Sequence, residues 1–104
     1  MGKIVAFTMK LLPGNEEAYE KRHNEIWPEL SALLRESGIE EYHIFLDKSS
    51  GTLFAFQRVN EKQSLSELPR HPIMKDWWAY MKDLMETNPD NSPKVKRLEN
   101  VFTL

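Results

Sequence analysis

The hydrophobic pattern of this chain switches between a period of two residues, typical of strands, and a period near 3.6 residues, typical of helices. Residues 3–11 alternate between apolar and less apolar side chains and therefore predict a first strand. Residues 39–47 and 52–59 flank a turn that contains Ser-Ser-Gly, which predicts a β-hairpin. Residues 94–104 can form a last strand. Segments with helical periodicity separate these strands, so the fold must combine both kinds of element.

The segment between the first two strands predicts a helix that is broken in its middle. Asn15 is a good N-cap residue, and Gly38 follows the end of the periodic stretch. Pro28 lies inside this stretch, where proline removes a backbone hydrogen bond and disfavours helix at the residue before it. We therefore expect a break near residues 24–27, with Pro28 opening the second piece.

Helical periodicity returns after the hairpin. Residues 73–85 predict a helix, which carries two of the three tryptophans of the chain. Residues 64–68 predict a shorter helix that Pro69 ends. Residues 86–93 are dense in Asn, Asp, Ser and Pro, and this composition predicts an ordered loop before the last strand.

The resulting order, β-α-β-β-α-β, is that of the ferredoxin-like split unit of the α+β class. Two helical segments would cover one face of a four-stranded antiparallel sheet, and residues 1–104 are expected to form one such domain. If the other face met water, alternate positions of each strand should be polar. Residues 42–46 and 52–56 are instead apolar on both parities. We therefore expect a second sheet, from another copy of the chain, to cover this face in a homodimer.

Composition excludes several classes of function. The chain has 14 Lys and Arg against 16 Asp and Glu, without the basic footprint that nucleic-acid binding requires. No apolar run approaches the roughly 18 residues of a membrane span, and the absence of cysteine excludes disulfides and thiolate chemistry. The three histidines lack metal-ligand spacing, and no glycine-rich phosphate loop is present. We expect a soluble cytoplasmic protein that uses no metal or cofactor.

One histidine interrupts an apolar helical stripe. The members of the stripe are spaced three or four residues apart and face the same way: Tyr19, His23, Ile26, Leu30 and Leu33. Histidine can give and take protons near neutral pH, so His23 is a candidate proton-transfer residue. Tyr19 lies one turn earlier on the same face and could bond to the same ligand. The alternative interpretation is a core histidine without a chemical role.

Aromatic side chains supply the candidate binding surface. Trp77 and Trp78 are adjacent on the later helical segment, where neighbouring side chains point about 100° apart and together form a wide face. Flat rings can stack on the C–H face of a sugar, although a plain core position is the alternative for both tryptophans. Tyr42 shares its strand parity with apolar residues, and its hydroxyl could reach into the same cavity or could merely cap the core at the edge of the sheet. His43 points to the opposite face and His71 lies in an apparent loop, so neither is assigned a role.

Four stretches of the chain carry recognisable motifs. They are Arg22-His23 followed by Ile26-Trp27-Pro28-Glu29-Leu30, Tyr42 followed by Ile44-Phe45-Leu46-Asp47-Lys48, Trp77-Trp78 followed by Tyr80-Met81, and Asn88-Pro89-Asp90-Asn91-Ser92-Pro93 with the closing Val101-Phe102. Taken jointly, with compatible spacing from end to end, these motifs resemble the L-rhamnose mutarotase family. Any one of them alone would be weak evidence.

The resemblance implies a dimeric, ferredoxin-like α/β barrel that interconverts the α and β anomers of L-rhamnose without a cofactor. The family's proton donor falls on His23, and its sugar-contacting residues fall on Tyr19, Tyr42, Trp77 and Trp78. Ring opening needs an acid and a base, so His23 could protonate the ring oxygen, with a tyrosine hydroxyl or a water as its complement. Two alternatives share this fold, namely a non-catalytic module that binds a small ligand and a small oxygenase.

Overall fold

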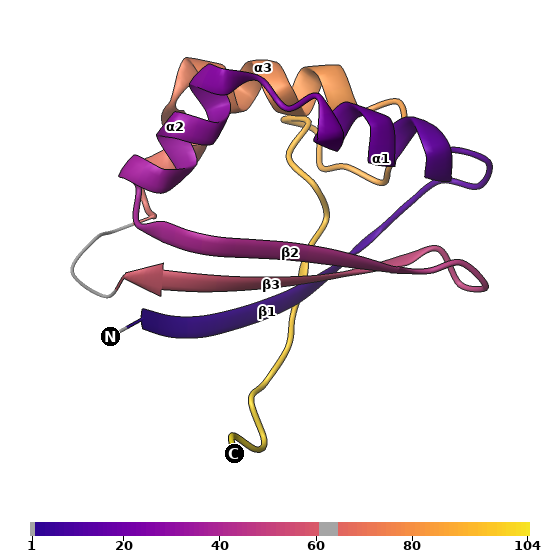
Figure 1. Ribbon diagram of the computed structural model, residues 1–104. Coiled ribbons are helices and arrows are strands. Elements are labelled where there is room, and N and C mark those ends of the chain that lie inside the picture. Colours follow the sequence, from indigo (N-terminus) through magenta and orange to yellow (C-terminus); the bar gives the residue numbers. More distant parts are fainter. Residues whose placement is uncertain (1, 61–64) are drawn as a thin grey trace.

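The computed structural model of the protein describes residues 2–60 and 65–104. Its strands are β1 (Gly2–Lys10), β2 (Ile39–Asp47), β3 (Thr52–Asn60) and β4 (Lys96–Arg97). Its helices are α1 (Glu16–Asn24), α2 (Pro28–Glu36) and α3 (Pro72–Met81), with the 3₁₀-helix η1 (Leu68–Arg70) before α3. In Figure 1 the α-helices form one layer over one face of the sheet.

The sheet is antiparallel and has the strand order β2-β3-β1-β4. β1 pairs with β3 along its whole length, with Phe7 opposite Ala55. β2 pairs with β3 on the other side, with Tyr42 opposite Gln57. The first strand and the hairpin predicted from alternation are therefore confirmed, and the protein is a small α+β fold.

The break predicted in the first helical stretch is also confirmed. α1 ends at Asn24, and α2 begins at Pro28, where the missing N–H of proline is not needed by the first helical turn. Between them, the N–H of Ile26 donates to the carbonyl of His23, and Trp27 has extended backbone. The chain bends between the two helices (Figure 1), and both remain in the same layer over the sheet.

α3 is shorter than its sequence pattern predicts, because it ends at Met81 and not at residue 85. The N–H of Leu84 turns back to the carbonyl of Met81, and the carbonyl of Leu84 accepts from the N–H of Leu12. Met85 then pairs with Leu11 just beyond β1. The chain leaves the helix because the extension of β1 offers its backbone new partners.

The last strand and the short helix also differ from expectation. β4 contains only Lys96–Arg97 of the predicted residues 94–104. The N–H of Leu98 still donates to the carbonyl of Ala6, but the chain then runs away from the sheet and the helices (Figure 1). The described part of the short helix predicted at residues 64–68 forms bends and turns up to residue 67. η1 follows and contains Pro69, because proline suits the first turn of a helix.

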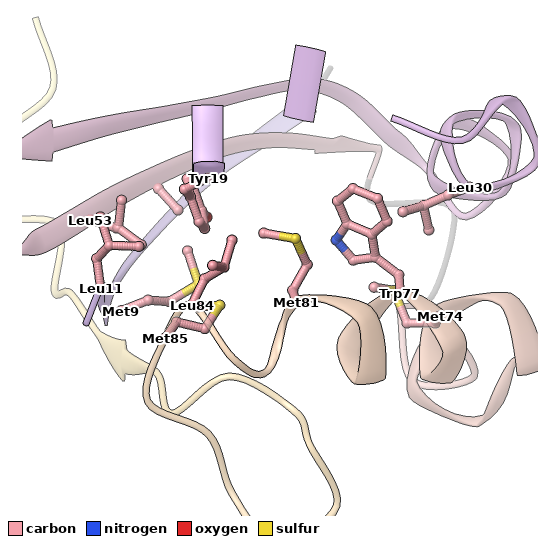
Figure 2. Close-up of a cluster of buried hydrophobic side chains, with 11 residues drawn as sticks. Met9, Leu11, Tyr19, Leu30, Leu53, Met74, Trp77, Met81, Leu84 and Met85 are labelled. Carbon is pink, nitrogen blue, oxygen red and sulfur yellow. The ribbon is translucent and has the colours of Figure 1, made fainter. Parts of the chain in front are cut away.

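A buried hydrophobic cluster lies between the sheet and the helices (Figure 2). Its members are Met9, Leu11, Tyr19, Leu30, Leu53, Ala55, Met74, Trp77, Met81, Leu84 and Met85. The cluster is rich in methionine, whose unbranched side chain fills irregular gaps between helices and strands. Tyr19 and Trp77 bring the two candidate site helices, α1 and α3, into this cluster.

The face of the sheet turned away from the helices carries exposed aromatic side chains. Phe45 on β2 and Phe56 on β3 are 62% and 37% exposed, with their ring centroids 6.0 Å apart. Ile4 on β1 is 47% exposed on the same face. The C-terminal segment ends on this side of the sheet in Figure 1, where Val101 and Phe102 are 90% and 73% exposed. Both faces of the sheet thus carry large apolar side chains, as the strand pattern predicts, although the outer face also holds the Arg58–Glu41 ion pair.

Candidate active site

A cavity of about 910 Å³ lies between the helix layer and the sheet. Tyr19 and His23 of α1, Tyr42 of β2, and Trp77 and Trp78 of α3 all line it. The structure therefore brings together, from three elements, all five side chains that the sequence selects. Small-molecule pockets are typically about 300–1,000 Å³ and combine apolar walls with a few polar groups, and this cavity has that character.

His23 lies near the end of α1, and the helix itself fixes one of its ring nitrogens. The Nδ1 of His23 is 3.1 Å from the carbonyl oxygen of Tyr19. A carbonyl oxygen can only accept, so Nδ1 carries the proton of the neutral ring and Nε2 carries the lone pair. Burial lowers the pKa of His23 below its ordinary value of 6.5, and the bond to the Tyr19 carbonyl opposes this shift only in part. The imidazole is therefore neutral at pH 7, with Nε2 able to accept a proton.

Aromatic rings hold this imidazole in place. The ring of Tyr19 lies 4.3 Å from it between centroids, tilted by 33°, and Trp77 meets it edge-on at 5.5 Å. Trp27, from the break between α1 and α2, meets Trp77 edge-on at 5.1 Å. Tilted and edge-to-face pairs at such distances are favourable. These rings take the place of water around His23, which accounts for its lowered pKa.

The two adjacent tryptophans have different surroundings. Trp77 is 6% exposed and extends from α3 into the buried cluster, in line with Met74 and Met81 (Figure 2). Trp78 is only half-buried and packs against the edge of the cluster. Trp77 is therefore both core and cavity wall, whereas Trp78 keeps more of its ring available to a ligand.

A polar residue that the sequence pattern does not single out lies beside Tyr42. Gln57 is opposite Tyr42 on β3, is 8% exposed and also lines the cavity. Burial raises the pKa of Tyr42 to about 12, and the neighbouring amide of Gln57 acts in the opposite direction. Burial also raises the pKa of Tyr19, so both phenols keep their protons at neutral pH. The sequence feature that could have pointed to Gln57 is its polar side chain at an inward position of β3, between Ala55 and Val59.

Arg22 joins α1 to the end of α3 beside the cavity. Its guanidinium donates to both carboxylate oxygens of Asp83, at 2.9 and 3.3 Å, and to the carbonyl of Tyr80 at 2.6 Å. Its Cζ also lies 4.5 Å from the centroid of the Tyr80 ring. Because Arg22 directly precedes His23, this fork fixes the turn of α1 that carries the imidazole against the helix that carries Trp77.

The other two histidines lie outside the cavity. His43, on the exposed face of the sheet, places Nε2 3.2 Å from Glu41 Oε2. His71 is the exposed N-cap of α3, where its Nδ1 accepts from the N–H of Ile73. Within residues 2–60 and 65–104, no group of three or more His, Cys, Asp or Glu side chains could hold a metal ion. Nor does this part of the chain contain a helix that is long and apolar enough to cross a membrane.

Comparison with known proteins decides the family. A sequence model of L-rhamnose mutarotase matches residues 4–104. The chain belongs to the L-rhamnose mutarotase family. The L-rhamnose mutarotases of Flavobacterium johnsoniae and Agrobacterium fabrum are 54% and 52% identical to it over 99 residues, which cover 95% of this chain and 92% of each relative. The resemblance drawn from the four motifs is confirmed.

The fold matches a solved mutarotase structure as well. The crystal structure of L-rhamnose mutarotase from Formosa agariphila superposes with a TM-score of 0.91 and 46% sequence identity, covering 98% of both chains. The α+β architecture of helices over one face of an antiparallel sheet is therefore shared by the two mutarotase family members. The cavity that holds His23, Tyr42 and the tryptophans lies within this shared architecture.

Proposed function

We propose that the protein is an isomerase that interconverts the α and β anomers of L-rhamnose, the sugar for which its relatives are named. One observation carries the proposal. A neutral His23, with its Nδ1 bonded to the helix and its Nε2 able to take a proton, lies in a cavity that Tyr19 and Tyr42 also line. This arrangement offers both a base and protonated acids to one bound sugar.

Anomer exchange moves two protons and leaves the composition of the sugar unchanged. In ring opening, the C1 hydroxyl loses its proton, and the bond between C1 and the ring oxygen breaks, with its electron pair going to the ring oxygen. The ring oxygen then takes up a proton, and C1 becomes an aldehyde. After rotation about the C1–C2 bond, the ring closes on the other face of the aldehyde with both proton transfers reversed. The reaction thus needs a base at one oxygen and an acid at the other.

We assign these two transfers to His23 and Tyr42. The resemblance implies that His23 protonates the ring oxygen, but a neutral imidazole must accept a proton before it can donate one. We therefore reverse that assignment: His23 takes the C1 hydroxyl proton during ring opening and returns it to the aldehyde oxygen during closure. Tyr42 keeps its proton at neutral pH because burial raises its pKa to about 12. Its hydroxyl gives this proton to the ring oxygen in opening and recovers it in closure.

The aromatic side chains can hold the sugar without fixing C1. Trp77 and Trp78 of α3 and Tyr19 of α1 line the cavity, and indole rings stack on the apolar C–H face of a sugar. We assign the stacking surface mainly to Trp78, because Trp77 is largely engaged with the His23 ring and the core. Contacts to the face of the ring leave the C1–C2 bond free to rotate.

We also propose that the fold is ferredoxin-like and that two copies pack sheet to sheet in a homodimer. The strand order β2-β3-β1-β4 is the order that a split β-α-β-β-α-β unit produces. Phe45 and Phe56 form an exposed aromatic patch on the open sheet face, and such patches commonly mark protein interfaces. The exposed C-terminal segment ends on the same side of the sheet and can contribute to this contact. We expect the dimer to work in the cytoplasm, in keeping with its cysteine-free sequence.

The experiment that tests this function is NMR saturation transfer between the C1 protons of α- and β-L-rhamnose. Purified protein should increase the exchange rate well above that of spontaneous mutarotation, which is measured in the same buffer and subtracted. If the protein adds nothing to the solvent rate but its tryptophan fluorescence still responds to L-rhamnose, the function is binding without catalysis. That result would replace the isomerase proposal.

A further inference from the structure

The side chain of Arg22 reaches from α1 to the end of α3. Its Nη1 and Nη2 donate to Oδ1 and Oδ2 of Asp83 at 2.9 and 3.3 Å, which is a bidentate pair, and Nη1 also donates to the carbonyl of Tyr80 at 2.6 Å. Tyr80 lies in the last turn of α3, where carbonyl groups lack partners within their own helix. Arg22 therefore caps α3 from another helix, and only 22% of its side chain is exposed.

The helix that carries His23 has few other anchors. The structure describes every residue of α1, and Tyr19 alone among them is buried. Tyr19 lies one turn before His23, whereas Arg22 lies in the same last turn of the helix as His23. Within the described residues, the side-chain hydrogen bonds from α1 to other parts of the chain all come from Arg22. The bridge from Arg22 is therefore the polar contact that fixes this last turn against α3.

The same bridge orders the aromatic side chains beside His23. The Cζ of Arg22 lies 4.5 Å from the centroid of the Tyr80 ring, and a cation over an aromatic ring is attractive. The Tyr80 ring lies 5.7 Å from Trp77 and 5.5 Å from Trp27 between centroids. Trp77 in turn meets the imidazole of His23 edge-on. Arg22 is thus linked to His23 twice, once along the backbone of α1 and once through the rings of α3.

The bridge lies outside the space in which the sugar would bind. Arg22, Tyr80 and Asp83 are absent from the described residues that line the cavity, whereas His23 is among those that do. Proton transfer requires close placement of the reacting groups, and a misplacement of about 1 Å can cost about 10²-fold in rate. A residue that sets the position of the imidazole from outside the cavity should therefore affect turnover more than sugar affinity.

We propose that Arg22 is a positioning residue for anomer exchange, whose bridge to Tyr80 and Asp83 holds the imidazole of His23 at the C1 hydroxyl of the bound sugar. This inference rests on the proposed mutarotase function and on the role of His23 in it. Arg22 acts through His23 and does not touch the substrate, so its loss lowers kcat and leaves KM nearly unchanged. A role in stability alone would lower Tm without changing the kcat of the folded protein.

Three substitutions at the bridge test the proposal. Arg22→Met keeps an unbranched side chain but removes the charge and every donor. It should lower kcat about tenfold, with KM within about twofold of the wild type, because the imidazole is displaced. Arg22→Lys keeps the charge but cannot form the bidentate pair, so its kcat should lie between those of Arg22→Met and the wild type. Asp83→Asn should also lower kcat, but by less than Arg22→Met, since the bond to the Tyr80 carbonyl remains.

Arg70→Met provides a matched control. Arg70 pairs with Glu67 at 3.5 Å, the two side chains are 81% and 74% exposed, and Arg70 is absent from the described residues that line the cavity. The same substitution there should leave kcat and KM at their wild-type values. The proposal is overturned if folded Arg22→Met keeps the wild-type kcat, if it raises KM alone, or if Arg70→Met loses as much kcat. If Arg22→Met does not fold, wild-type kcat in both Arg22→Lys and Asp83→Asn overturns it.

The NMR signals of the His23 ring protons give a readout that does not depend on activity. The imidazole lies 4.3 Å from the ring of Tyr19 and 5.5 Å from that of Trp77 between centroids, so their ring currents shift its signals. The chain has three histidines, and His23→Ala assigns the signals. At about pH 8, where a free imidazole is neutral, the signals should move toward those of an exposed histidine in Arg22→Met and stay in place in Arg70→Met. Unchanged signals in Arg22→Met overturn the positioning role alone. A wild-type protein without exchange overturns the mutarotase function, and this inference with it, whatever the signals show.

Discussion

The Nδ1 of His23 lies 3.1 Å from the carbonyl oxygen of Tyr19, one helical turn earlier, while the two rings are 4.3 Å apart between centroids. The first contact sets which nitrogen carries the proton, and the second restricts the plane of the ring. α1 thereby supplies a base whose tautomer and orientation are set before any sugar binds. Such preorganisation is what a proton-transfer residue requires, because its reactive nitrogen must meet a moving proton within hydrogen-bond distance.

Replacement of His23 by alanine should remove most of the anomer exchange. Loss of a positioned acid or base typically costs about 10²–10⁴ in rate, and neither His71 nor His43 is among the described residues that line the cavity. Saturation transfer measures the remaining exchange after the spontaneous rate is subtracted, with circular dichroism as the control for folding. If a folded His23→Ala variant kept near-wild-type exchange, proton transfer would belong to Tyr19 and Tyr42 instead.

The pH dependence of kcat/KM should show an acidic limb below pH 6.5. Burial lowers the pKa of His23 from 6.5, so the neutral ring that accepts a proton persists to lower pH than in a free histidine. As the pH falls through the lowered pKa, the ring becomes protonated and exchange declines. The rate should be nearly constant from about pH 7 to pH 8. His43→Ala should leave this profile unchanged, because His43 lies on the opposite face of the sheet. A limb above pH 6.5 would contradict the burial argument.

The elements that the sequence predicts well are those set by neighbours along the chain. Alternation placed the strands, and Pro28 placed the break between α1 and α2, because proline acts on its own helical turn. The predicted element ends are wrong where hydrogen bonds to backbone far away in the sequence determine where a helix or strand stops. α3 ends at Met81 because Leu84 bonds to Leu12, which is far away in sequence. β4 is short because the segment after Leu98 leaves β1, although its own pattern suits a strand.

The same division applies to the candidate site. A helical stripe was enough to select Tyr19 and His23, since spacing along one helix fixes a shared face. The sequence alone does not predict that Gln57 lies beside the candidate site, because its position opposite Tyr42 depends on the register of β3 against β2. The neutral tautomer of His23 likewise depends on a distance to a carbonyl oxygen that spacing cannot supply.

Truncation of Trp77 and truncation of Trp78 should have different effects on stability and on sugar binding. Trp77→Ala should destabilise the protein by about 3–5 kcal/mol, because it removes a large side chain from the core and leaves a cavity. Trp78→Ala should cost less stability, since Trp78 is only half-buried. Relative to that smaller loss of stability, it should weaken L-rhamnose binding more than Trp77→Ala does. Thermal unfolding and an NMR titration with the sugar measure the two quantities. Trp78→Phe is the control that keeps a flat ring. Equal affinity in wild type and Trp78→Ala would assign Trp78 to packing alone.

The last prediction concerns assembly through the open face of the sheet. Light scattering at micromolar concentration should give twice the chain mass of 12.3 kDa. Phe45→Glu should shift the protein toward monomers, because it sets a charge into the aromatic patch of the proposed contact, where it would be desolvated without a partner.

Ala32→Glu is the matched control for the dimer. Ala32 is exposed on α2, in the helix layer on the opposite side of the sheet, so the same new charge there should leave the dimer intact. A wild-type chain that stays monomeric and soluble would remove the sheet-to-sheet contact from the proposal. A dimer that survives Phe45→Glu but dissociates with Ala32→Glu would move the interface to the helices. In that case the dimer would not explain why β2 and β3 carry apolar side chains on the open face of the sheet.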